Sequence, residues 1–208
     1  APVYDQGALG ACTAFAMGKG MRESMQRRDS EAVAPLSALF LYFEERAKMG
    51  TRWQDSGATI TDGMAVLKDK GIATDETWPY ATNFLKFRLK PSGAAYKSAT
   101  AYKITETKQI GTIDDVRAAL AAGKTVPFGF LVYSSFQRVG SDGVMPMPTA
   151  GEQPMGGHAV LAVGYDDQKR MLTVRNSWGK GWGDDGYFYM PYDFAADRNM
   201  ADDFWAAN

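Results

Sequence analysis

The spacing of apolar residues changes near residue 96, and this change constrains the fold more than any other feature of the sequence. Before it, apolar residues recur every three to four positions, as on the buried face of a helix. The clearest stripe comprises Ala14, Gly18, Met21 and Met25. A glycine inside a helix costs about 1 kcal/mol relative to alanine, so we expect close packing at Gly18. Further helices are expected after Ser37, as N-cap, and from Thr61 or Asp62 to Lys70.

After residue 96, short runs rich in β-branched and aromatic residues predict strands. The expected strands include Tyr102, Ile104 and Ile110, then residues 125–133, 159–165, 171–176 and 187–190, with one helix over 112–122. The sequence therefore predicts an α+β fold in a single domain, 1–208. Its helical lobe is expected over 8–95, and its β-rich lobe over 96–208 together with 1–7.

Composition excludes several classes of protein. The chain has 208 residues, of which 45% are hydrophobic, so it can bury a sizeable core. Its 23 basic and 24 acidic residues nearly balance, which argues against nucleic-acid partners and anionic membranes. Its longest apolar runs are shorter than the roughly 20 residues that span a bilayer, so no membrane span is expected. One cysteine and one histidine exclude an intramolecular disulfide and a Cys/His zinc cluster, and no phosphate-binding loop indicates a cofactor.

The single cysteine, Cys12, stands where the first helical stripe begins. The unpaired N–H groups and positive dipole end of a helix N-terminus favour a thiolate, which suits a nucleophile. Gln6, six residues earlier, offers an amide donor. The alternative is that Cys12 is a small buried apolar residue.

The single histidine, His158, follows Gly157 and opens the apolar strand from Ala159. Alone, it is also compatible with a structural residue at a strand start. Asn176 lies 18 residues later, in Asn176-Ser177-Trp178-Gly179. A lone cysteine at a helix start, a lone histidine and a downstream asparagine together match the nucleophile, base and orienting residue of thiol acyl transfer.

With these motifs the chain resembles the papain family of cysteine peptidases, from Pro2 to about Tyr189. The matching stretches are Gln6-Gly7, Gly10-Ala11-Cys12, Gly157-His158-Ala159, and Asn176 to Gly183 followed by Gly186-Tyr187. The resemblance implies a papain-like two-lobe fold. It has a helical left lobe, an antiparallel β-barrel-like right lobe and an active-site cleft between them.

The resemblance also implies roles for individual residues. Cys12 would be the nucleophile, His158 the general base and then acid, Asn176 the residue that orients the imidazole, and Gln6 an oxyanion donor. Trp178 would shield the Asn176–His158 hydrogen bond from water. The expected substrate-binding residues are Gly57, Ala58, Thr59, Ile60, Gly157, Trp178 and Trp182. Thr59 and Ile60 would line the pocket for the second residue before the scissile bond and favour an apolar side chain there.

The sequence departs from the family pattern at Leu9, Thr13 and Asp55, where the family has cysteine, tryptophan and cysteine. The absence of disulfides indicates a microbial branch, and we expect an exported monomer whose targeting segment lies upstream of this chain. A peptide or protein substrate is implied, with an N-terminal pro-segment or a proteinaceous inhibitor as a further partner. We therefore predict a thiol endopeptidase. The alternatives are acyl transfer to an amine on the same triad and a catalytically silent binding module.

Overall fold

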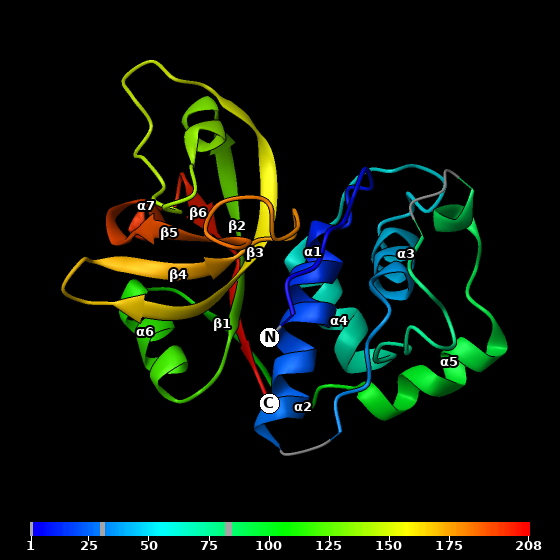
Figure 1. The fold of residues 1–208 in the computed structure, drawn as a ribbon. Coiled ribbons are helices and arrows are strands. Elements are labelled where there is room, and N and C mark those ends of the chain that lie inside the picture. Colours follow the sequence, from blue (N-terminus) through cyan, green and yellow to red (C-terminus); the bar gives the residue numbers. More distant parts are fainter. Residues whose placement is uncertain (1, 30–31, 82–84) are drawn as a thin grey trace. The chain divides into compact units, whose positions relative to one another are not determined.

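The computed structural model describes residues 2–29, 32–81 and 85–208, which form two compact units (Figure 1). Unit 1 comprises Ala1–Asp5 and Gln109–Ala206, and unit 2 comprises Gln6–Lys108 and Ala207–Asn208. The sequence placed the main boundary near residue 96. The structure places it between Lys108 and Gln109, because the helical turns that follow residue 92 pack within unit 2.

Unit 2 is helical, as the apolar spacing predicts. Its elements are α1 (Cys12–Ala14), η1 (Phe15–Arg22), α2 (Glu23–Arg28), α3 (Ala38–Lys48), α4 (Ile60–Asp69), η2 (Lys86–Arg88), α5 (Gly93–Ala99) and η3 (Thr100–Tyr102). Ser37 is the N-cap of α3 and accepts a hydrogen bond from Phe40 N at 3.0 Å. The next helix begins slightly earlier than predicted, because the side chain of Thr59 caps it by accepting from Asp62 N at 3.0 Å.

The first three elements form one continuous helical run, of which η1 is π-helical. An ideal Cβ at Gly18 would lie 2.5 Å from Ile72 Cδ1, so the predicted close packing is present. Polar side chains of this helical run are buried as well as its apolar ones. Lys19 there pairs with Asp75, and Glu23 accepts from Leu36 N at 3.0 Å. Lys19 and Glu23 are therefore matched to specific partners, as burial of charged groups requires.

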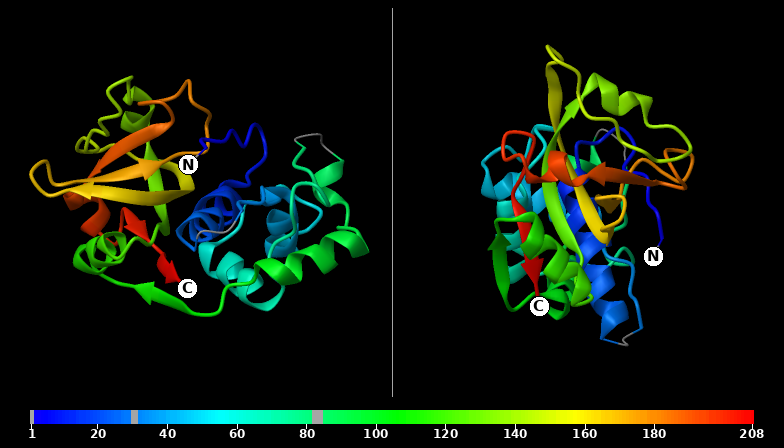
Figure 2. Two further views of the ribbon diagram at one scale, coloured as in Figure 1. Left: turned by 60° about the horizontal axis from the view of Figure 1, so that its bottom comes forward. Right: turned by 90° about the vertical axis from the view of Figure 1, so that its left-hand side faces the viewer.

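Unit 1 is organised on an antiparallel sheet with strand order β5-β4-β3-β2-β6, seen from two more directions in Figure 2. The strands are β2 (Val126–Tyr133), β3 (Pro154–Asp166), β4 (Met171–Arg175), β5 (Tyr187–Pro191) and β6 (Ala201–Asp202). The unit also contains α6 (Ile113–Ala121), η4 (Ser134–Arg138) and α7 (Tyr192–Ala196), and β1 (Thr107–Ile110) pairs with β7 (Phe204–Ala207) in a separate two-stranded sheet. Over the described residues the five-stranded sheet does not close. The sequence analysis expected a β-barrel-like lobe, whereas the structure has an open sheet with β5 and β6 at its edges.

One local prediction was wrong, and one helix was not predicted. Tyr102 ends a 3₁₀ turn, and the strand begins only at Thr107. The sequence analysis also missed α5, whose N-cap Ser92 accepts from Ala95 N at 3.2 Å. At the C-terminal end, the ring of Phe204 stacks on Phe128 with centroids 4.6 Å apart, so this segment belongs to the core of unit 1. None of the helices in the described ranges has the length and apolarity to cross a membrane.

Candidate active site

The predicted site residues are divided between the two units, and each set is described within its own unit. Unit 1 holds Gly157, His158, Asn176, Trp178 and Trp182. Unit 2 holds Gln6, Cys12, Gly57, Ala58, Thr59 and Ile60.

His158 and Asn176 are joined by a hydrogen bond. His158 lies on β3, opposite Phe130 of β2, and Asn176 follows the last residue of β4. His158 Nε2 lies 2.8 Å from Asn176 Oδ1, and both side chains are buried. The antiparallel pairing of β3 with β4 thus brings together two residues 18 positions apart.

The backbone of Ser177 determines which nitrogen of His158 carries hydrogen. Ser177 N donates to Asn176 Oδ1 at 2.8 Å, and a backbone N–H is always a donor. The Asn176 atom that faces both Ser177 N and His158 Nε2 is therefore the amide oxygen, which can only accept. His158 Nε2 must then carry a hydrogen and act as the second donor. In the neutral ring, Nδ1 is then left as the lone-pair nitrogen that can accept a proton.

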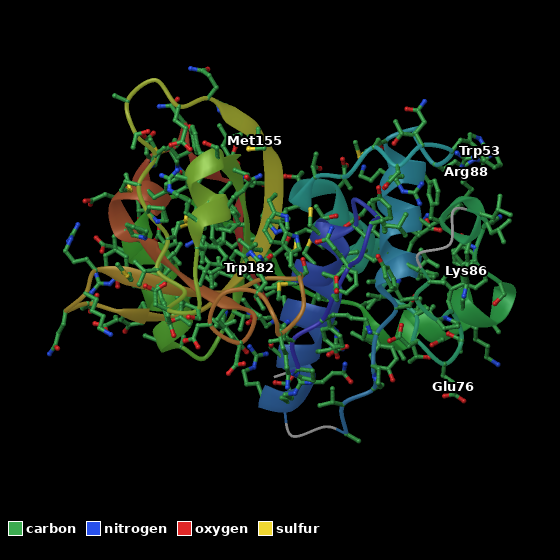
Figure 3. All side chains as sticks on the ribbon, turned by 45° about the horizontal axis from the view of Figure 1, so that its top comes forward. Trp53, Glu76, Lys86, Arg88, Met155 and Trp182 are labelled. Carbon is green, nitrogen blue, oxygen red and sulfur yellow. The ribbon has the colours of Figure 1, made fainter. Side chains whose placement is uncertain are left out.

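Tryptophan rings shield this pair. The ring of Trp178 stacks on His158 with centroids 4.8 Å apart and an interplanar angle of 25°. Trp182, labelled in Figure 3, packs edge-on against Trp178 at 5.2 Å. Phe136 contacts both tryptophans. The indole of Trp178 therefore lies against the imidazole.

Burial lowers the pKa of His158 to about 4, and the hydrogen bond with Asn176 opposes this shift in part. An imidazole in this setting stays neutral at pH 7 unless a negative charge stabilises its protonated form. Gly157, the residue before it, is exposed, and an ideal Cβ there would meet no atom within 4 Å. The histidine is thus desolvated, whereas the adjacent backbone faces open space.

The loop before Cys12 holds Gln6 in a fixed orientation. The buried Gln6 side chain donates from Nε2 to Leu9 O at 2.8 Å, and Tyr80 Oη donates to Gln6 O at 2.7 Å. Leu9 O also accepts from Ala11 N at 2.8 Å. The Leu9 carbonyl thus accepts hydrogen bonds from both the Gln6 side chain and Ala11, the residue before Cys12.

Cys12 is the first residue of α1, is half-exposed and forms no disulfide. Its N-cap, Ala11, provides no side-chain acceptor for the N–H groups of the first turn. A thiol at this position experiences the partial positive charge of the helix end, which favours a thiolate. The helix start predicted for the cysteine is confirmed.

The residues of the predicted substrate-binding turn differ in how accessible they are. Gly57 has a φ of 69°, which favours glycine, and both it and Ala58 are half-buried. The hydroxyl of Thr59 is used in capping α4, and Ile60 is only 2% exposed. The accessible surface of this turn therefore comes more from Gly57 and Ala58 than from the isoleucine.

The sequence analysis missed three residues beside the predicted ones. Ser177 orients the Asn176 amide through its backbone, and Asp55 accepts from Gly10 N at 3.0 Å. Glu45 accepts from the hydroxyl of Thr13 at 2.8 Å, and complete burial raises the pKa of Glu45 well above its usual range. No local sequence pattern predicts these contacts. Asn176 and Ser177 are adjacent in the stretch that matches the family, but their adjacency does not reveal the hydrogen bond between them.

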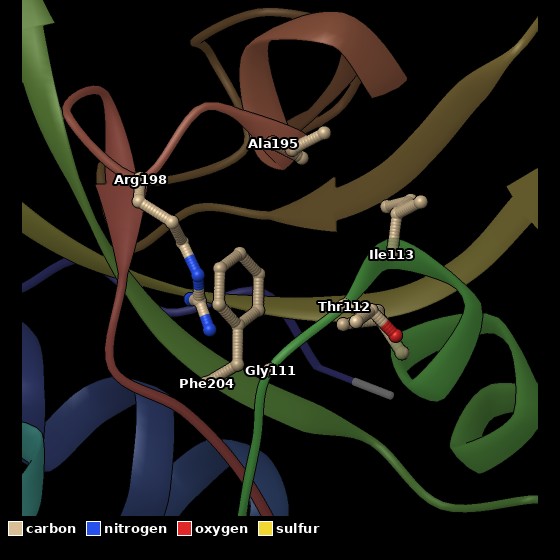
Figure 4. A pocket seen from close by; sticks show the side chains of 8 residues that line it. Gly111, Thr112, Ile113, Ala195, Arg198 and Phe204 are labelled. Carbon is tan, nitrogen blue, oxygen red and sulfur yellow. The ribbon is translucent and has the colours of Figure 1, made fainter.

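A cavity of about 220 Å³ in unit 1 is separate from these residues (Figure 4). Its lining residues are Gly111, Thr112, Ile113, Val116, Ala195, Ala196, Arg198 and Phe204. The guanidinium carbon of Arg198 lies 5.8 Å from the centroid of the Phe204 ring. The lining includes none of the predicted site residues.

Comparisons with known proteins find similarity along nearly the whole chain. The profile described as "Papain family cysteine protease" matches residues 1–206. The peptidase C1-like protein L477 of Acanthamoeba polyphaga mimivirus is 39% identical over 212 residues, covering 97% of this chain and 68% of that protein. Mouse pro-cathepsin H is 31% identical over 196 residues, but this chain covers only 55% of it.

Among solved structures, xylellain, a cysteine protease from Xylella fastidiosa, superposes with a TM-score of 0.92 at 40% identity. The match covers 99% of this chain and 82% of xylellain.

Proposed function

Because the chain belongs to the papain family of cysteine proteases, we propose that it cleaves internal peptide bonds through an acyl-enzyme on Cys12. The observation that carries the assignment of roles is the Ser177–Asn176–His158 arrangement, which leaves Nδ1 of His158 as the basic nitrogen. Asn176 orients the ring in this proposal, and the single histidine serves as the base.

The proposed reaction has two stages. Cys12 Sγ attacks the scissile carbonyl carbon, and its proton passes to His158 Nδ1. The C–N bond then breaks, and the amine leaves with that proton. Water attacks the thioester, gives a proton to the same nitrogen, and releases the acid and the thiol.

The negative oxygen of each tetrahedral intermediate needs hydrogen-bond donors. We assign this role to Cys12 N–H, at the start of α1, and to the side-chain amide of Gln6. The bond from Gln6 Nε2 to Leu9 O holds that amide in a fixed orientation. Donors held in place before the reaction stabilise charge that develops only in the transition state.

Hydrolysis of casein and of a peptide blocked at both ends tests the proposal, with Cys12→Ala as the control. We expect the wild type to cut both and the variant to cut neither. Cleavage restricted to unblocked ends would refute internal cleavage. Product masses that show transfer to an added amine would favour acyl transfer, and failure of an epoxide inhibitor to label Cys12 would favour a silent binding module.

We also propose a preference for an apolar second residue before the scissile bond, supported by the accessible, half-buried backbone of Gly57 and the small apolar side chain of Ala58. A strong demand for arginine or lysine there in a peptide library would contradict it.

We further propose a longer, exported precursor with an N-terminal pro-segment, supported by the greater length of mouse pro-cathepsin H. Fractionation of the source cells and the mass of the native protein before and after maturation test this proposal. A protein confined to the cells, with no change in mass, would refute it.

A further inference from the structure

Four residues of unit 2 connect the loop before Cys12 to the predicted substrate-binding turn. We call them the Asp55 cluster: Gly10, Tyr42, Asp55 and Gly57. Gly10 N donates to Asp55 Oδ1 at 3.0 Å and to Oδ2 at 3.2 Å. The hydroxyl of Tyr42 donates to Asp55 Oδ1 and accepts from Gly57 N at 3.1 Å. Two backbone segments more than 40 residues apart are thus joined through two side chains.

Tyr42 gives this cluster a rigid base. It lies on α3, is fully buried, and its ring packs against the guanidinium of Arg46 with 4.1 Å between the guanidinium carbon and the ring centroid. Burial and the bond to Asp55 raise the pKa of Tyr42 above its usual range, so its hydroxyl keeps its hydrogen. A hydroxyl has one hydrogen to donate, and Tyr42 donates it to Asp55. Asp55 is therefore an acceptor in each of its bonds to Gly10 and Tyr42.

Gly10 links the cluster to the proposed oxyanion donors. It lies between Leu9, whose carbonyl holds the Gln6 amide, and Ala11, the N-cap of the Cys12 helix. The contact is close, because an ideal Cβ at Gly10 would lie 3.2 Å from Asp55 Oδ1. Any movement of Gly10 would therefore displace both the Gln6 side chain and Cys12 N–H.

We propose that Asp55 is a positioning residue for the reaction. Its carboxylate holds Gly10, and through it the two oxyanion donors, in place relative to the Gly57 turn. Asp55 does not touch the reacting atoms. The inference rests on the proposed function, and deepens it by assigning the support of the oxyanion site to a residue 43 positions after the nucleophile.

The test compares Asp55→Ala and Asp55→Asn with the wild type and with Asp69→Asn, an exposed carboxylate of the same unit. Four quantities are measured: kcat and KM for a blocked peptide, the affinity of a peptide aldehyde, and the rate at which iodoacetamide alkylates Cys12. The aldehyde forms a tetrahedral adduct that needs the oxyanion donors, whereas alkylation needs only a reactive sulfur.

For Asp55→Ala we expect kcat and aldehyde affinity to fall together by about 10- to 100-fold, because small displacements of aligned groups have effects of this size. KM and the alkylation rate should stay within about twofold of the wild type. Asp55→Asn keeps one acceptor oxygen, so it should recover part of the loss, and Asp69→Asn should behave as wild type.

Unchanged kcat and aldehyde affinity in Asp55→Ala would overturn the inference. A parallel fall in alkylation would also overturn it, since that result indicates general damage to the site. If Asp55→Ala does not fold, Tyr42→Phe and Asp55→Asn provide the same comparison, and wild-type values in both would refute the role. Failure of the proposed function is distinct, because the wild type itself would then not cleave the peptide.

Discussion

The pKa of His158 gives a direct test of the site geometry, because the chain contains a single histidine. NMR signals from one imidazole therefore report on the site without assignment ambiguity. We suggest the Cys12→Ala variant, which removes the sulfur and prevents self-digestion. In this variant we expect the folded imidazole to titrate near pH 4, well below its ordinary value of 6.5, because it is buried.

The same shift predicts how stability depends on pH. The unfolded chain binds a proton with a pKa of about 6.5, and folded His158 binds one only near 4. Between these values the unfolded state carries more protons, so the free energy of unfolding falls as the pH drops. A difference of 2.5 pKa units corresponds to about 3.4 kcal/mol, of which about 2.5 kcal/mol is lost by pH 4.5.

Urea unfolding at pH 7 and pH 4.5 measures this loss. Cys12→Ala/His158→Gln serves as the control, because it retains every carboxylate and lacks the imidazole. The loss on acidification should be about 2.5 kcal/mol larger with the histidine than without it. An imidazole that titrates near 6.5, with equal losses in the two variants, would show that the ring is hydrated.

Restoring the cysteine extends the test. A thiolate partner would stabilise the protonated ring, so His158 should keep its proton to higher pH in the wild type than in Cys12→Ala. The two groups would then titrate as a coupled pair. Identical titrations in the two proteins would contradict the proposed roles of Cys12 and His158.

Three further predictions follow from the packing and the hydrogen bonds. Gln6→Ala should lower kcat by about 100- to 1000-fold with little change in KM, as measured on a blocked peptide, because one oxyanion donor is lost. Gly18→Ala should lower the free energy of unfolding by about 1–3 kcal/mol, since the added methyl would lie 2.5 Å from a neighbouring side chain. Gly93→Ala, with no atom within 4 Å, is its control in the same urea titration. Trp178→Ala should raise the pKa of His158 in the NMR titration by admitting water to the ring.

Periodicity and capping residues allowed most of the fold to be predicted. The helix capped by Ser37 and the strand that carries His158 follow from patterns within a few residues. The strand expected at Tyr102 was wrong because the alternation was too short to distinguish a strand from a 3₁₀ turn. The open sheet could not be foreseen, since closure depends on which edges pair and not on the content of each strand.

The contacts that support the site could not be predicted from patterns in the sequence. Asp55 and Gly10 are 45 positions apart, and no spacing rule connects a turn to a distant loop. Asp55 stands where the chain departs from the family pattern, so the resemblance does not supply the contact either. Ser177 acts through its backbone N–H, which its side-chain chemistry does not reveal.

The N-terminal residues of unit 1 have a consequence for synthesis on the ribosome. Pro2 O accepts from Arg175 at 3.1 Å, and Tyr4 O accepts from Gly179 N at 3.0 Å, on either side of Asn176. These residues emerge from the ribosome well before their partners, which follow more than 170 positions later in the chain. The asparagine of the proposed site therefore gains this support only after Gly179 has been translated, so a nascent chain carries Cys12 well before His158 and Asn176 are in place.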